Sequence, residues 1–226
     1  EYQVRLKRPH EWQQRLIENA APRCIVRAGR RSGKTVGLAI LAVQRFLAGA
    51  RVLYGTPTSD QLDTFWFEIK QALAEPIAAG VFYKNETEHI IELPGTQQRI
   101  RAKTCWNADT LRGDTADLLI FDEYQLMNED AWTVVGAPML LDRDGQAVFL
   151  YTPPSLFSAG ISKAHDPRHA AKLFSQALAD KTGRWAAVHF TSQDNPYISK
   201  EALAAITQDM SRDAYRREIL AEDDDA

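Results

Sequence analysis

Residues 28–35 of the 226-residue sequence read AGRRSGKT. This is the spacing of a Walker A phosphate-binding loop, with alanine in the first small position. An apolar run at residues 24–26 precedes the loop, and a helical pattern from about Lys34 to Leu47 follows it. A strand before the loop and a helix after it are the context that such a loop requires, so the pattern predicts a nucleotide-binding site.

Each position of the loop has an expected task. Gly29 and Gly33 let backbone amides curl around phosphate oxygens, and the start of the helix adds partial positive charge. Lys34 would reach the β- and γ-phosphates of ATP, and the Thr35 hydroxyl would bind Mg²⁺. The two arginines of the loop can be solvated cations, or Arg30 can reach the γ-phosphate from the same chain. The predicted nucleotide contacts of the loop are Ala28, Gly29, Arg30, Arg31, Ser32, Gly33, Lys34 and Thr35.

A second motif is the apolar run Leu118–Phe121 followed by Asp122 and Glu123, a Walker B pattern. Four apolar residues predict a buried central strand that presents two carboxylates at its carboxyl end. Asp122 would contact the nucleotide through Mg²⁺, held directly or through water. Glu123 would polarise the attacking water as a general base. The adjacent glutamate separates this group from the kinase and GTPase branch of P-loop folds.

Two smaller motifs complete the predicted site. Thr152 ends an apolar strand and is followed by two prolines, so its hydroxyl would sense the γ-phosphate. A simple strand end is the alternative for Thr152. Gln13 lies upstream of the loop, and its amide offers a donor and an acceptor to the edge of adenine. The alternative for Gln13 is an exposed polar residue at the start of a helix.

Short apolar runs alternate with helical patterns along the chain, which indicates a mainly parallel sheet flanked by helices. We therefore expect an α/β P-loop NTPase fold of the additional-strand catalytic-glutamate type. Thr58 and Gln61 have the spacing of a capping box for a helix that runs to about Leu73. The expected ATPase core spans residues 1–160. Residues 161–226 are expected to form a small lid subdomain and the start of a linker.

The sequence pattern changes at residues 90–103 and is typical there of an antiparallel hairpin inserted in the parallel core. Arg99, Arg101 and Lys103 recur at every second position, so they should share one face of a strand. Three cations on one face repel each other, and the phosphates of double-stranded DNA would be suitable partners. A solvated face, or pairing with the glutamates at positions 86–92, is the alternative.

Composition limits these hypotheses. Apolar residues make up 45% of the chain and charged residues 25%, which is ordinary for a globular protein, and the net charge is −3. A DNA binder with this balance must concentrate its cations locally. No apolar stretch is long enough to span a bilayer, so we expect no membrane partner. Cys24 and Cys105 are expected as buried thiols, and residues 222–225 as a solvated acidic tail.

Taken together, these residues resemble the N-terminal ATPase domain of the bacteriophage terminase large subunit, the DNA-packaging motor. The resemblance rests on Gln13 before the Walker A loop, on the arginines of that loop, on the Walker B pair and on Thr152. It covers essentially the whole chain, because it also includes Leu111-Arg112-Gly113, Asp194-Asn195-Pro196 and Tyr215 to Leu220. By this resemblance Arg30 is the Walker A arginine that contacts the γ-phosphate, and Thr152 is the coupling motif that links hydrolysis to movement.

Arg112 resembles the arginine finger that a neighbouring subunit inserts in ring motors of this kind. It also follows a polar loop and precedes the central Walker B strand, where an arginine can supply transition-state charge across an interface. An ion pair with Asp109 or Asp114 is the alternative.

The resemblance implies a Mg²⁺-dependent ATP hydrolase that drives double-stranded DNA into a procapsid. It also implies a ring, expected to be pentameric, with portal and small-terminase partners in the cytoplasm of an infected bacterium, and a protein that is not a stable virion component. Full-length members continue into a nuclease domain of RNase H-like fold, and we expect no nuclease activity from these residues. The alternatives are a helicase-like nucleic-acid-dependent ATPase and a nucleotide switch, against which Glu123 argues.

Overall fold

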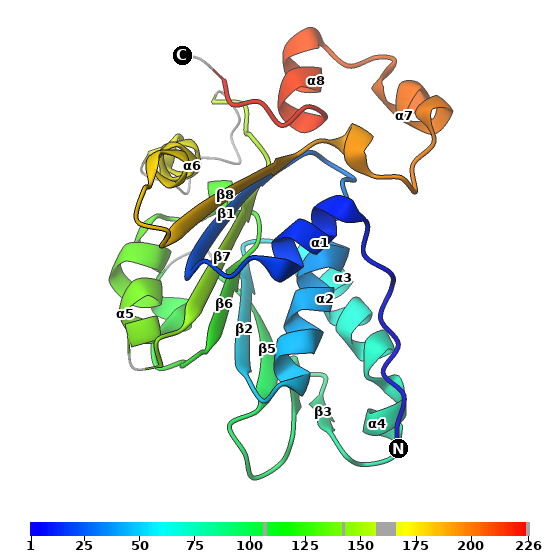
Figure 1. The fold of residues 1–226 in the computed structure, drawn as a ribbon, viewed down its shortest axis with the longest axis vertical. Coiled ribbons are helices and arrows are strands. Elements are labelled where there is room, and N and C mark those ends of the chain that lie inside the picture. Colours follow the sequence, from blue (N-terminus) through cyan, green and yellow to red (C-terminus); the bar gives the residue numbers. More distant parts are fainter. Residues whose placement is uncertain (106–107, 142, 157–165, 225–226) are drawn as a thin grey trace.

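A single eight-stranded sheet forms the centre of the protein, in the order β3-β4-β5-β2-β6-β7-β1-β8 (Figure 1). The computed structural model describes residues 1–105, 108–141, 143–156 and 166–224. All neighbouring strands from β5 to β8 pair in parallel. The strands are β1 Arg23–Ala28, β2 Arg51–Thr56, β3 Tyr83–Asn85, β4 Ile90–Glu92, β5 Arg99–Thr104, β6 Leu118–Phe121, β7 Gln146–Tyr151 and β8 Trp185–Phe190.

Helices cover both faces of the sheet. The helices are α1 Glu11–Glu18, α2 Lys34–Leu47, α3 Ser59–Ala72, α4 Ala74–Ala78, α5 Ala137–Leu141, α6 His169–Ala179, α7 Lys200–Thr207 and α8 Arg212–Glu218. α1, α2 and α3 bury one apolar cluster, which includes Val26 of β1. α5 and α6 lie on the opposite face, whose cluster includes Ile25, because successive strand residues point to opposite faces. Within the described residues, no helix is long and apolar enough to cross a membrane.

The strand order brings the predicted motifs together. β7 lies between β1, which leads into the Walker A loop, and β6, which ends before Asp122. This inserted strand is the additional strand of the expected class, and the predicted fold class is confirmed. Because the three strands are parallel, their carboxyl ends meet at one edge of the sheet. Ala28, Asp122 and Thr152 therefore lie at the same edge.

The predicted hairpin is present, but β5 is also part of the parallel sheet. β4 and β5 pair antiparallel, with Ile91 opposite Ile100, while β2 pairs in parallel with the other edge of β5. Burial alternates along β5, with Ile100 and Ala102 in the core. The three cations of β5 occupy the alternate positions, so the prediction that they share a face is confirmed.

The expected boundary near residue 160 differs from the structure. β8 pairs with β1 from Arg23 opposite Trp185 to Ala28 opposite Phe190, and α6 places Phe174 in the same cluster as Ile25. Both elements follow residue 160 and belong to the core, because pairing with β1 satisfies the backbone of β8. Only α7 and α8 lie beyond the end of the sheet (Figure 1). A lid limited to these two helices stays a proposal.

Candidate nucleotide-binding site

The Walker A loop turns from β1 into α2 through two residues of positive φ. Arg31 has a φ of 55° and Gly33 a φ of 86°, and glycine adopts the latter without steric cost. The turn places Lys34 at the start of α2, where its Nζ donates to Thr152 Oγ1 at 2.9 Å. Thr152 Oγ1 donates in turn to the Ala28 carbonyl at 2.8 Å. The end of β7 is therefore tied to both ends of the loop, as a γ-phosphate sensor requires.

α1 braces the loop from outside. Gln13 donates through Nε2 to the Gly33 carbonyl at 2.7 Å and accepts from His10 N at 3.0 Å. The His10 ring accepts from Gln13 N, so its other nitrogen carries the proton and donates to the Ser32 carbonyl at 3.0 Å. Gln13 is thus a buried brace rather than an exposed polar residue. Each of its amide atoms can make one further bond, and contact with adenine stays a proposal.

Residues near the C-terminal end hold the loop from the other side. A Cβ on Gly29 would lie 2.5 Å from the Ile219 carbonyl oxygen and 2.8 Å from Ser192 N. Arg30 N donates to the Glu218 carbonyl at 2.6 Å, and its Nη2 lies 3.2 Å from Glu218 Oε1. The structure therefore requires Gly29 for close packing against the end of α8, a reason that the sequence did not reveal.

Asp122 is fully buried at the end of β6. Its Oδ2 accepts from the Tyr54 hydroxyl at 2.6 Å, and its Oδ1 accepts from Glu123 N at 2.9 Å. Burial raises the pKa of Asp122, while the nearby Lys34 ammonium and these two donors act to lower it. The donors and the lysine favour the ionised carboxylate that a metal ligand must be.

Glu123 follows with a φ of 53°, a left-handed conformation that costs a non-glycine residue about 1–3 kcal/mol. Thr58 Oγ1 donates to its Oε2 at 3.1 Å. Burial raises the pKa of Glu123, and Asp122 adds to this effect, while Lys34 and Thr58 act in the opposite direction. A carboxylate with a raised pKa accepts a proton more readily, which suits a general base.

The predicted capping box at the start of α3 is wrong. Thr58 is the N-cap residue, but its side chain makes no cap bond and binds Glu123 instead. Gln61 Oε1 accepts from Thr35 Oγ1 at 3.0 Å. The Thr58 hydroxyl forms a stronger hydrogen bond with the Glu123 carboxylate than it would with a backbone amide, because a charged partner strengthens a hydrogen bond. Both side chains therefore belong to the site.

A cavity of about 550 Å³ opens between the Walker A loop and the end of β6. Cations of the loop and the Glu123 carboxylate face it, and α8 contributes two further charged residues. The lining includes Arg30, Arg31, Lys34, Gln61, Glu123, Thr152, Arg217 and Glu218. A mixed lining of this kind suits a triphosphate and an attacking water.

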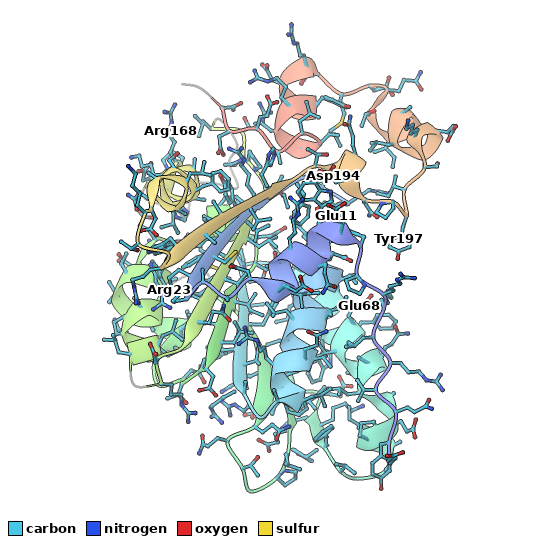
Figure 2. The ribbon with its side chains drawn as sticks, in the orientation of Figure 1. Glu11, Arg23, Glu68, Arg168, Asp194 and Tyr197 are labelled. Carbon is cyan, nitrogen blue, oxygen red and sulfur yellow. The ribbon has the colours of Figure 1, made fainter. Side chains whose placement is uncertain are left out.

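A second cavity, of about 450 Å³, lies on the other side of Gly33 and is also lined by Gln13, Val36 and Tyr197. Tyr197 is 71% exposed and lies on the segment between β8 and α7, close to the start of α1 (Figure 2). Its hydroxyl donates to the Arg8 carbonyl at 3.2 Å. An exposed ring beside an aliphatic side chain suits a flat base, so the two cavities fit the two ends of a nucleotide.

The residues present also fit a magnesium ion. Thr35 offers a hydroxyl oxygen and Asp122 a carboxylate, the hard donors that Mg²⁺ prefers. Within the described residues, Ser32 Oγ is buried without a hydrogen-bond partner, and a phosphate oxygen would satisfy it. Thr35 and Asp122 are thus the residues that would hold the ion.

The three cations of β5 converge on one carboxylate. Arg99, Arg101 and Lys103 lie 3.4, 3.3 and 2.7 Å from the carboxylate oxygens of Asp114, whose side chain is 6% exposed. These cations therefore have an anionic partner within the protein, and that partner is Asp114. Three cations on one carboxylate still leave excess positive charge, so contact with DNA stays a proposal.

Arg112 is exposed, and the described lining of the 550 Å³ cavity does not include it.

The acidic end is not a solvated tail in its described part. Asp223 Oδ2 lies 3.0 Å from Arg27 Nη1 and accepts from the Tyr151 hydroxyl at 2.8 Å. Glu222 and Asp224 pair with arginines of α8. A run of like charges is stable here because each carboxylate meets its own cation. The contact of Asp223 with Arg27 and Tyr151 ties the segment after α8 to β1 and β7.

Cys24 and Cys105 are buried free thiols, as expected, and burial raises the pKa of each to about 12.

Sequence reasoning missed Tyr54, Thr58, Gln61, Arg217 and Glu218. Tyr54 lies on β2, next to β6 in the sheet, so adjacency to the Walker B strand was its only signal. The spacing of Thr58 and Gln61 was recognised and assigned to a helix cap. Glu218 contacts the Walker A loop and Arg217 lines the same cavity, but both lie far along the chain from the loop and nothing in their spacing indicates this.

Comparison with known proteins agrees with this geometry. No protein-family model matches the chain. The terminase large subunit of Thermus virus P23-45 is 27% identical over 169 residues, an alignment that covers 66% of this chain and 34% of that protein. The chain thus spans about a third of the length of the curated relatives that it matches.

Solved structures extend the likeness to almost the whole chain. A variant of the ATPase domain of the Thermus phage P74-26 large terminase superposes with a TM-score of 0.77 at 20% identity, covering 96% of this chain and 95% of that one. The large terminase of a thermophilic bacteriophage, in complex with ATP-gamma-S, gives 0.66 at 17% identity, covering 94% and 52%. The chain is similar in sequence to phage terminase large subunits and has the fold of the ATPase domain of the Thermus phage P74-26 large terminase.

Proposed function

We propose that this chain is the ATPase motor domain of a terminase large subunit, which hydrolyses ATP to move double-stranded DNA into a procapsid. The observation that carries the proposal is that Lys34 and Glu123 line one cavity. A phosphate-binding cation and a general base in one cavity are what hydrolysis of a γ-phosphate needs. The relatives are packaging proteins, which favours a motor over the helicase-like alternative.

The residues divide the reaction among them. Lys34, Arg30 and the amides of the loop bind the phosphates, and Glu123 accepts a proton from the attacking water. Thr35 and Asp122 would hold Mg²⁺, which supplies charge neutralisation at the phosphate oxygens when bound. The cavity lining supports the tasks of Arg30, Lys34 and Glu123, and the donor chemistry of Thr35 and Asp122 supports the metal task.

The same site links hydrolysis to the ends of two elements. Phosphate and Glu218 would compete for the Arg30 guanidinium, because Arg30 pairs with Glu218 of α8. Thr152 contacts Lys34 and lies at the end of β7. A change at the γ-phosphate would therefore reach α8 through Arg30 and β7 through Thr152, which suits a motor that converts hydrolysis into movement.

The partners of this motor follow from its family. We propose self-association into a ring, with pentamers expected, in which Arg112 enters the site of a neighbouring subunit. Double-stranded DNA is the proposed substrate, a portal and a small terminase subunit are the proposed docking partners, and the host cytoplasm is the proposed place of action. Arg99, Arg101 and Lys103 are candidate DNA contacts, limited by their bonds to Asp114.

The test is ATP turnover per subunit against protein concentration, with Mg²⁺ present and then removed by a chelator. The proposal predicts turnover that rises on self-association, stops without Mg²⁺ and is abolished in Lys34→Ala. The ammonium of Lys34 is the cation that the loop places on the β/γ oxygens. Normal turnover in Lys34→Ala would refute the assignment of the phosphate site.

A further inference from the structure

The segment between β5 and β6 has to travel backwards along the sheet. β5 and β6 both run parallel to β2, which lies between them, so the chain must return from the end of β5 to the start of β6. From residue 108 onwards this return contains only a short 3₁₀ turn, Ala108–Leu111. A segment without its own ladder of backbone bonds depends on side chains to fix its course.

Arg112 lies between two fixed points of this return segment. On one side, the Leu111 side chain is fully buried in the cluster with Leu119, and Lys103 Nζ donates to the Thr110 carbonyl at 2.7 Å. On the other side, Asp114 is held by the cations of β5. The Arg112 side chain is exposed between these anchors.

Three cations from one strand hold the anchor at Asp114. Cations at alternate positions of β5 are about 6.6–6.8 Å apart along a strand, yet all three reach one carboxylate. β5 is itself rigid, because β4 and β2 pair with its two edges. Lys103 contributes twice, since it binds both Asp114 and the Thr110 carbonyl. The β5 cations therefore fix the return segment before and after Arg112.

We propose that Asp114, with Arg99, Arg101 and Lys103, positions Arg112 for entry into a neighbouring subunit's nucleotide site. The inference rests on the proposed function, in which Arg112 acts as an arginine finger. A finger has to cross an interface to reach a γ-phosphate, so its loop must keep its shape without support from its own nucleotide. The four residues are positioning residues, since they act through Arg112 and not on the nucleotide.

The burial of the cations favours positioning over direct contact with DNA. Their side chains are 15–24% exposed, and each already has a bond to Asp114. A residue that grips a duplex presents its charge to solvent, whereas these charges point at a nearly buried carboxylate. The two roles also predict opposite effects for Asp114→Asn. Loss of the carboxylate frees positive charge for DNA but leaves the Arg112 loop without its anchor.

The experiment measures ATP turnover against protein concentration for the 226-residue chain, together with ATP affinity, in four variants. Arg112→Ala removes the finger, Asp114→Asn and Lys103→Gln release its loop, and Asp117→Asn is the matched control. Asp117 lies on the same return segment directly before β6, where it pairs with Arg143 and accepts from Arg51 N at 2.8 Å. A misplacement of about 1 Å can lower a rate by about 10²-fold. We expect Asp114→Asn and Lys103→Gln to lose most of the increase in ATP turnover per subunit that self-association brings, while their ATP affinity is kept. We expect Asp117→Asn to keep both that increase and its ATP affinity.

Mixing separates positioning from general damage. Asp114→Asn has an intact Glu123, and Glu123→Gln has an intact Arg112 loop, so the mixture should regain turnover that neither variant has alone. Asp114→Asn mixed with Arg112→Ala should stay inactive, because neither chain offers a positioned arginine. If Asp114→Asn instead had a damaged nucleotide site and a positioned Arg112, it would regain turnover with Arg112→Ala and not with Glu123→Gln.

Three results would overturn the inference in distinguishable ways. If Arg112→Ala loses the increase in turnover on self-association and Asp114→Asn keeps it, Arg112 is a finger that needs no anchor at Asp114. If Arg112→Ala keeps the rise, the finger assignment itself is wrong, and the positioning role falls with it. A failure of Asp114→Asn to be rescued by Glu123→Gln, in a variant that still binds ATP, would also contradict positioning.

Discussion

The Thr58 hydroxyl donates a hydrogen bond to the Glu123 carboxylate at 3.1 Å. Thr58 stands at the start of α3 and Glu123 at the end of β6, so the bond joins two elements at the edge of the sheet that carries the site. The bond favours the ionised form of Glu123 and lowers its pKa, against the larger effect of burial, which raises the pKa. Thr58 thereby orients the proposed general base and favours its ionised form.

Replacing Thr58 by valine should therefore move the acid limb of the pH–rate profile. Only ionised Glu123 can accept a proton, so turnover falls as the pH drops through the pKa of this carboxylate. Without the hydroxyl that pKa rises further, and the limb shifts to higher pH. Turnover at saturating ATP is measured across the acid range, with Thr58→Ser as the control that keeps the hydroxyl. An unshifted limb in Thr58→Val would separate this bond from catalysis.

Asp223→Ala should destabilise the fold although the residue lies near the C-terminal end. The substitution leaves the half-buried Arg27 guanidinium and the Tyr151 hydroxyl without their shared acceptor. Leaving such groups unsatisfied costs about 1–3 kcal/mol in the free energy of unfolding, measured by denaturant titration. Glu222→Ala removes an exposed pair with Arg216 and should change that free energy by only about 0.5 kcal/mol or less. Equal effects of the two variants would mean that the Asp223 contact adds nothing beyond a surface pair.

Gly29→Ala should release α8 from the Walker A loop. The new Cβ would meet the Ile219 carbonyl oxygen at 2.5 Å, and backbone cannot move aside as a flexible side chain can. We expect faster tryptic cleavage at the arginines of α8, and a loss of about 1–3 kcal/mol in stability. Gly49→Ala is the control, because it brings backbone strain at a φ of 98° into open space. If cleavage within α8 is equal in the two variants, contact with Gly29 does not hold this helix.

Sequence predicted the parts of the site that lie within one continuous motif. The Walker A loop, the Walker B pair and Thr152 each follow a strand, and parallel strands bring such residues to one edge whatever the loops between them do. The contacts that the sequence did not predict join segments that share no motif. Asp114 lies in a return segment with no regular pattern, and α8 reaches Gly29 across most of the chain.

The boundary and the capping box failed for a related reason. A helix cap and a bond to a catalytic carboxylate use the same residue types, so Thr58 and Gln61 fit two roles, and tertiary packing chose between them. β8 lies in the part of the chain that the sequence assigns to the lid, because sequence does not say which strand it will pair with. Asp223 pairs with Arg27 because the end of the chain folds back onto β1, which composition cannot reveal.

The most direct test of the account compares ATP binding with ATP hydrolysis in Glu123→Gln. The amide keeps the shape of the side chain and removes the base, so affinity for ATP should stay near the wild-type value while turnover falls by about 10²–10⁴-fold. The variant should also be at least as stable as the wild type at neutral pH. Burial raises the pKa of Glu123 in the folded state, so its ionisation costs stability as the pH rises through that pKa, and glutamine removes the cost.

Two results would contradict the account. If ATP binding falls in parallel with turnover, Glu123 holds the nucleotide or the metal and does not activate water. If turnover persists at the wild-type rate, the base lies elsewhere and the central claim fails. Retained binding with turnover reduced at least about a hundredfold is the result that the geometry of Lys34, Asp122 and Glu123 predicts.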